Sequence, residues 1–267
     1  MSPRSAHAPL NGIDCAYEMA GDGPPVVLLH AGIADSRMWA AQFDALATNH
    51  TVIAYGRRGF GRTRPAPGPF NHVDDLAALL GYLGIKRTAL VGCSQGSRIA
   101  LDFALAHPDQ VSRIVLSAPS VSGFRYDGPP PRQADAIDAA EAAGDLARVN
   151  ELEMQIWVDG PRRAPDAVAS SVRRLVAEMN AIALANEGVG EERPPDRPAA
   201  GRLGEVGAPV LLVVGELDAA ITLAVAEALA GGLPNVRRVD LLAAHLPNME
   251  QPEAFNRAVG PFLGERA

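Results

Sequence analysis

The sequence has little lysine, little cysteine and few aromatic residues. Lys86 is the only lysine among 24 basic residues, and the formal net charge is -7. An acidic chain of this kind argues against a nucleic-acid or anionic-membrane surface, because both need clustered positive charge. The two cysteines, Cys15 and Cys93, are too few and too far apart for a disulfide framework or a metal site.

Long hydrophobic runs are also missing. No apolar stretch approaches the roughly 20 residues that cross a membrane, and the first residues, MSPRSAHAPL, lack the apolar core of a signal peptide. We therefore expect a cytoplasmic protein with no membrane partner, and the oligomeric state stays open. Hydrophobic residues make up 48% of the 267, which is enough for one sizeable core.

Short apolar runs alternate with helical patterns along the chain. Strands are expected at residues 26–29, 51–55, 88–91, 113–116, 210–214 and 236–241. Helices are expected at 74–83, 95–106, 221–230 and 252–263. Such alternation predicts an α/β fold, in which helices cover both faces of a mostly parallel sheet. Residues 13–19 are expected to add an antiparallel edge strand.

One block interrupts the alternation, because residues 121–203 contain no convincing strand. Apolar side chains recur there at helical spacing, with Met154 and Trp157 in an earlier helix and Met179 in a later one. Proline-rich joints, GPPPR and ERPPDRP, bracket the block. We therefore expect a core domain of residues 1–120 and 204–267, with residues 121–203 as a helical insertion between two strands.

The segment GCSQG, residues 92–96, stands where a strand must become a helix. A turn this tight forces its central residue into a strained backbone conformation, and the flanking glycines relieve the crowding. Ser94 is then exposed at the carboxyl edge of the sheet, beside the positive end of a helix. A serine hydroxyl is a weak nucleophile, so it also needs a base and a group that orients the base.

Topology selects the partners of Ser94. His245 follows the last expected strand by a few residues, which places it on a carboxyl-edge loop, whereas His7 is expected in an unstructured leader. His30 also ends a strand at this edge, but its position before Ala31 suggests that it shapes the next loop. Among the acids, Asp218 is preferred to Glu216, which follows its strand too closely to reach across.

The order Ser94, Asp218, His245 on this pattern resembles the α/β-hydrolase family. VVLLHAGIADSRMW is similar to the family's oxyanion loop, YGRRGFGRT to its D-x-R-G-x-G-x-S turn, and GCSQG to its nucleophile elbow. VVGELD and HLPNMEQPEAF resemble its acid and histidine segments. The resemblance implies an α/β-hydrolase fold with the insertion as a helical cap.

The family's mechanism, carried over by position, gives each residue a role. The backbone N–H groups of Gly32 and Gln95 would form the oxyanion hole. Ser94 would attack a carbonyl carbon while His245 takes its proton and Asp218 orients the imidazole. This chemistry requires no metal and no cofactor. Cys93, next to the nucleophile, is expected to be a buried packing residue.

The sequence departs from the family pattern near this site. Gly56 stands where an aspartate is usual, Ala31 replaces a glycine, and Ala244 lies where glycine is common. These positions leave loop conformations, and therefore close substrate analogies, open.

The substrate is expected to be a small molecule. The segments SRMW and HLPNMEQPEAF resemble enol-lactonases and small carboxylesterases, so a carboxylic ester or lactone is the first choice. The same triad serves C–C bond hydrolases and perhydrolases, and some proteins of this fold are ligand receptors or non-hydrolytic biosynthetic catalysts. The pocket is expected to include Ile33, Met154 and Trp157, although apolar residues at helical spacing can equally be core.

Overall fold

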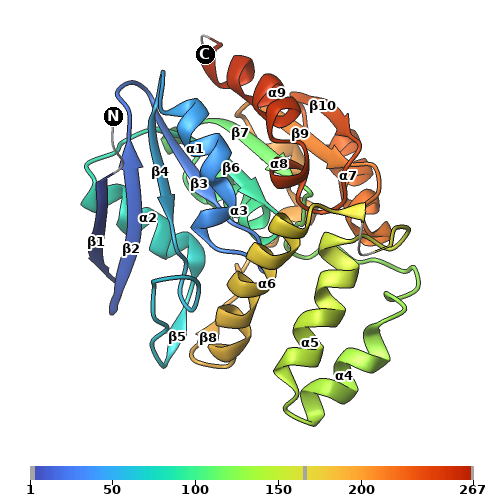
Figure 1. Cartoon of the computed structure of the whole chain (residues 1–267). Coiled ribbons are helices and arrows are strands. Elements are labelled where there is room, and N and C mark those ends of the chain that lie inside the picture. Colours follow the sequence, from blue (N-terminus) through green and yellow to red (C-terminus); the bar gives the residue numbers. More distant parts are fainter. Residues whose placement is uncertain (1–3, 165–166, 266–267) are drawn as a thin grey trace.

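A computed structural model describes residues 4–164 and 167–265 of the chain (Figure 1). Its main sheet has eight strands in the order β1-β2-β4-β3-β6-β7-β9-β10, and β5 and β8 form a separate pair. The strands are β1 (Arg4–Leu10), β2 (Ile13–Ala20), β3 (Pro25–Leu29), β4 (Thr51–Tyr55), β5 (Pro69–Phe70), β6 (Thr88–Cys93), β7 (Val111–Ser117), β8 (Glu191–Glu192), β9 (Val210–Gly215) and β10 (Val236–Leu241).

Helices lie on both sides of the sheet (Figure 1). They are α1 (Ala40–Leu46), α2 (His72–Tyr82), α3 (Gln95–Ala106), α4 (Ala134–Ala142), α5 (Leu146–Glu153), α6 (Ser170–Ala185), α7 (Ala220–Gly232), α8 (Pro247–Glu250) and α9 (Pro252–Gly264). All strand pairs from β4 to β10 are parallel, so the α/β fold and its mostly parallel sheet are confirmed.

The central strands are apolar on both faces because two separate cores need them. On β3, Val27 and Leu29 pack into the cluster with α2, α3 and α7, whereas Val26 and Leu28 pack into the cluster with α1 and α9. Successive side chains of a strand point to opposite faces, so a strand between two helical layers must be continuously hydrophobic. This explains why the short apolar runs marked strands.

The predictions for the amino-terminal residues, an unstructured leader followed by an edge strand, were wrong in two respects. Arg4–Leu10 forms β1, so His7 lies in a strand instead of an unstructured leader. Strand β2 lies between β1 and β4 and is antiparallel to both, so it is not the edge of the sheet. The edge strand β1 carries Pro9 and a mostly exposed face, which a search for apolar runs overlooks.

Residues 121–203 leave the sheet after β7 and return before β9, two strands that are neighbours. In Figure 1, α4 and α5 project away from the sheet, and α6 lies between them and the core strands. The regular elements described in the block are helical except for β8, which pairs with β5 of the core. The described part of the chain contains no helix that combines the length and the apolarity needed to cross a membrane.

Candidate functional site

Ser94 stands between β6 and α3 in a strained conformation, with φ 53° and ψ -116°. A Cβ atom at Gly92 would overlap the backbone at Gly96, and one at Gly96 would overlap the carbonyl groups of Leu29 and His30. The two glycines are therefore required, because α3 begins in direct contact with the neighbouring strand. This contact is what turns the chain sharply at Ser94.

His245 and Asp218 lie on the loops after β10 and β9, and their side chains meet. The Nδ1–H of His245 donates to both carboxylate oxygens of Asp218, at 3.0 and 2.9 Å. Both residues are buried, with 4% and 1% of their surfaces exposed. Glu216, the alternative acid, is exposed. Asp218 also accepts the backbone N–H of Ala219 at 2.7 Å, so it orients the histidine and the start of α7 together.

Ser94 and His245 line the same cavity, which has a volume of about 140 Å³. Trp157, from the insertion, lines it as well, and its ring lies 4.6 Å from that of His245, centroid to centroid. The backbone N–H of His245 donates to the carbonyl of Trp157 at 3.3 Å. Ile33 and Met154 instead lie in the core cluster that includes α1 and α9, and they do not line this cavity.

Gly32 and Gln95 are brought side by side. Gln95 is the first residue of α3, where backbone N–H groups have no partner within the helix. A Cβ atom built on Gly32 would lie 3.3 Å from Oε1 of Gln95, so the Gln95 side chain packs directly against the Gly32 backbone. Neither residue lines the cavity of Ser94 and His245, whereas both line a separate, polar cavity of about 390 Å³, together with Glu153 and Glu192.

Cys93, the neighbour of Ser94, is fully buried. Burial raises the pKa of its thiol, and the charge of Asp218 raises it further, so the thiolate that a nucleophile needs is disfavoured. This environment agrees with a packing role. Among the described residues, no group of three or more His, Cys, Asp or Glu side chains is placed to hold a metal ion.

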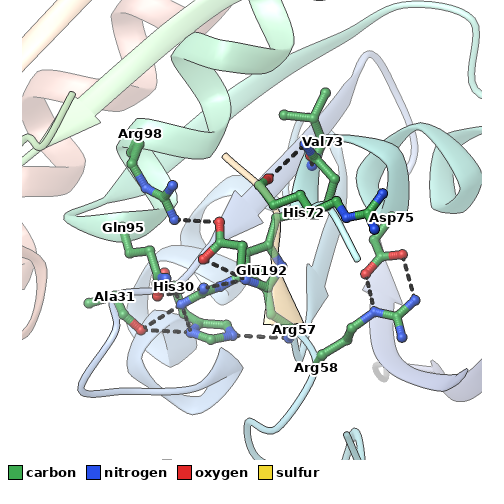
Figure 2. A network of polar contacts seen from close by, with 12 residues as sticks. His30, Ala31, Arg57, Arg58, His72, Val73, Asp75, Gln95, Arg98 and Glu192 are labelled. Carbon is green, nitrogen blue, oxygen red and sulfur yellow. Dashed lines mark hydrogen bonds and ion pairs between the residues drawn. The ribbon is translucent and has the colours of Figure 1, made fainter. Parts of the chain in front are cut away.

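A buried polar network, which sequence reasoning did not predict, lies around Ala31 and Gln95 (Figure 2). Its centre is Arg57, whose Nη1 donates to Oε1 of Gln95 at 2.6 Å. Its Nη2 donates to the carbonyls of His30 and Ala31, at 3.2 and 3.1 Å. Neighbouring Arg58 instead pairs with buried Asp75.

The two histidines of this network are held neutral. Burial lowers the pKa values of His30 and His72 well below 6.5, and the charge of Arg57 lowers them further. Because Nε2 of His30 accepts the backbone N–H of Arg57 at 3.1 Å, its proton lies on Nδ1, which donates to the carbonyl of Ala31 at 2.8 Å. His30 thus shapes the loop that follows it.

The local sequence offered one signal for the network, the adjacent pair Arg57-Arg58 in YGRRGFGRT. Nothing in that pattern distinguishes the arginine that pairs with a carboxylate from the one that binds carbonyl groups. Their partners come from loops and helices far apart in the sequence, so the difference emerges only in the folded chain.

A model of the alpha/beta hydrolase fold family matches residues 24–252. The chain is 27% identical to a pimeloyl-acyl-carrier-protein methyl ester esterase of Aeromonas hydrophila subsp. hydrophila, over 93% of this chain and 99% of that protein. It resembles the crystal structure of a hydrolase from Pseudomonas aeruginosa, with TM-score 0.80, 26% identity, and coverage of 98% of this chain and 99% of that one.

A third similarity concerns the fold alone. The crystal structure of an enol-lactonase from Burkholderia xenovorans superposes with TM-score 0.79 over 97% of this chain and all of that chain, at 24% identity. The relatives are named as hydrolases and esterases, which confirms the prediction of an enzyme of the hydrolase class. Since the family model covers most of the sequence, the chain belongs to the α/β-hydrolase fold family, as its motifs predict.

Proposed function

We propose that the protein is a cofactor-independent serine hydrolase that cleaves a small-molecule carboxylic ester or lactone through an acyl-enzyme on Ser94. The observation that carries this proposal is the buried His245–Asp218 pair, which opens onto the same cavity as Ser94. Within the described residues, Ser94 and His245 are not hydrogen bonded. Catalytic hydrogen bonds are often loose without substrate and tighten when it binds.

In the proposed first half-reaction, Oγ of Ser94 attacks the carbonyl carbon and Nε2 of His245 takes its proton. The negative charge that develops on the carbonyl oxygen is stabilised by the N–H groups of Gly32 and Gln95. His245 then gives the proton to the departing alkoxide, which leaves the acyl group on Ser94. Asp218 keeps the imidazole oriented and stabilises its charged form throughout.

In the second half-reaction, His245 takes a proton from water, and the resulting hydroxide attacks the acyl carbon. The tetrahedral intermediate collapses, Ser94 regains its proton from His245, and the carboxylic acid departs. A lactone follows the same steps, except that its alkoxide remains attached to the acyl group, so one hydroxy acid is the only product.

Residues 121–203 act as a cap in this proposal and set the substrate range. Trp157, Val121 and Phe124 from this block line the cavity of Ser94, opposite Ile221 and Val225 of α7. These walls are apolar, which favours an apolar acyl group. Trp157 is half-buried and touches His245, so a bound acyl chain would contact it close to the reacting carbon.

The test combines covalent labelling with turnover. A fluorophosphonate probe should label Ser94, and Ser94→Ala should lose both labelling and hydrolysis of short p-nitrophenyl esters and small lactones. Cys93→Ala is the matched control and should keep both. Labelling that persists in Ser94→Ala would contradict the assignment, and a single slow burst with retained product would indicate a ligand receptor instead.

A further inference from the structure

Arg57 is a buried cation in an unusual environment. Only 2% of its surface is exposed, and among the described residues no carboxylate lies within ion-pair distance of its guanidinium. Its Nε atom is buried without a hydrogen-bond partner. A buried charge that forms no ion pair lowers the stability of a fold, and the longer-range charge of Glu192 offsets only part of this cost.

The contacts of the guanidinium connect two separate segments of the chain. Nη2 donates to the carbonyls of His30 and Ala31, which immediately precede Gly32, and Nη1 donates to the Gln95 side chain (Figure 2). The ring of Phe60, whose centroid lies 4.4 Å from Cζ, covers the guanidinium. One planar group therefore fixes the loop after β3 against the first turn of α3.

Oε1 of Gln95, the atom that Arg57 binds, is also the atom that faces Gly32. Oε1 accepts from Arg57 and lies 3.3 Å from the position of a Cβ atom on Gly32. Moving Arg57 would release this oxygen and change how closely the two backbones approach. Arg57 therefore holds the side chain that packs against the Gly32 backbone.

We propose that Arg57 is a positioning residue of the oxyanion hole, whose guanidinium fixes the two backbone N–H donors of Gly32 and Gln95 at the spacing that the reaction intermediate requires. The inference rests on the proposed function. Burial lowers the pKa of Arg57 to about 10, so the group stays charged at neutral pH and keeps its fork of donors. His30 and His72, whose pKa values are lowered, add no positive charge beside it at neutral pH, whereas Arg98 of α3 opposes its charge.

The test compares an ester with its thionoester, in which sulfur replaces the carbonyl oxygen. Sulfur accepts N–H hydrogen bonds poorly, so an intact oxyanion hole favours the ester strongly. Arg57→Met should lower kcat for the ester about 10- to 100-fold, since small misplacements of catalytic donors cost this much. The thionoester should lose far less, so the ester-to-thionoester ratio of kcat/KM should fall. Fluorophosphonate titration of Ser94 corrects for the folded fraction.

Two further variants separate positioning from folding. Gln95→Leu keeps the backbone donor but removes the oxygen that Arg57 holds, and should lower the same ratio even if Arg57→Met fails to fold. Arg98→Met is the matched control, because Arg98 belongs to the same network and pairs with Glu192, and among the described residues its side chain makes no hydrogen bond to the loop after β3. Its ratio should equal that of the wild type.

The outcomes are distinct. If ester and thionoester turnover fall equally in Gln95→Leu and in the Arg57 variant, the role is structural and the inference is wrong. If neither variant changes the turnover of either substrate, the inference is wrong as well. If the wild type shows no Ser94-dependent turnover at all, both the inference and the proposed function are wrong.

Discussion

Histidines stand in opposite electrostatic environments on the two sides of Ser94. On the side of β9 and β10, His245 faces the carboxylate of Asp218. On the side of β3 and β4, His30 and His72 face the guanidinium of Arg57, and their pKa values are lowered. A neighbouring carboxylate favours a protonated imidazole and a neighbouring guanidinium opposes it, whereas burial opposes it on both sides.

This contrast shows that residues of one type stand in two electrostatic environments, one with a carboxylate and one with a guanidinium, on the two sides of Ser94. In the proposed mechanism, the side with Asp218 accepts the proton of Ser94. The side with Arg57 is suited to holding backbone groups rigidly, since its histidines remain neutral acceptors and donors. A single site can give residues of one type different roles by placing them in different electrostatic environments.

The largest expected effect comes from removing His245 and Asp218, the residues proposed to accept and stabilise the proton. His245→Ala and Asp218→Ala should each lower kcat by about 10⁴-fold or more, because triad members act as one unit. The double variant should be nearly as inactive as His245→Ala alone. Ester kinetics on purified variants, with active sites titrated, measure these losses.

Glu216→Ala serves as the control for the acid. Glu216 is exposed two residues before Asp218, so its removal should leave kcat near the wild-type value. If Asp218→Ala remains active while Glu216→Ala does not, the acid has been misassigned.

The next largest effect concerns Trp157, the residue of the insertion that lies beside His245. Trp157→Ala should change the preferred acyl chain length, because the half-buried ring lines the Ser94 cavity beside His245. Met154→Ala is the matched control, since Met154 is 1% exposed in the core cluster. It should lower the free energy of unfolding by about 2–5 kcal/mol and leave the length preference unchanged.

An ester-length series and denaturant unfolding on both variants distinguish the two roles. A large loss of stability in Trp157→Ala, combined with an unaltered length preference, would assign the tryptophan to the core and remove it from the pocket.

The smallest expected effect is a pH dependence of stability that comes from the two histidines beside Arg57. His30 and His72 have lower pKa values folded than unfolded, so below about pH 6.5 the unfolded chain binds more protons and stability falls. Each contributes a loss of about 1.4 kcal/mol per pH unit between its two pKa values. Around His72, Arg57 and Arg98 oppose protonation, whereas Glu192, 3.9 Å from Nε2, favours it.

Urea unfolding at several pH values between 5 and 7.5 measures this slope. His72→Gln, which cannot be protonated, should make the slope shallower by roughly 1.4 kcal/mol per pH unit. An unchanged slope would show that His72 is not held neutral by its surroundings.

The sequence predicted the central sheet well because its strands are apolar on both faces. It located Ser94, Asp218 and His245 at one edge because parallel strands all end there. The exposed strand β1 escaped notice since only alternate side chains are buried, and Pro9 weakens the strand signal. The contact between Trp157 and His245 depends on how the insertion folds back, which no local pattern encodes.

Arg57 shows the limit of sequence reasoning most clearly. Its neighbour Arg58 has a carboxylate partner in Asp75, a pairing of opposite charges of the kind that pattern analysis can anticipate. Arg57 instead binds the backbone carbonyls of His30 and Ala31 and the uncharged side chain of Gln95, so no pattern of opposite charges in the sequence marks its partners.

In a chimera that replaced residues 121–203 with the insertion of a relative, β5 would lose its partner strand. Glu192 would leave with the exchanged segment, and Arg98 would lose its ion pair, 2.7 Å long in the native chain. Arg57 would lose the charge of Glu192, which favours its protonated form. A graft joined between α6 and β8 would instead transplant the helices and leave β8 native. The useful crossover point for recombination therefore lies inside the insertion, ahead of its returning strand.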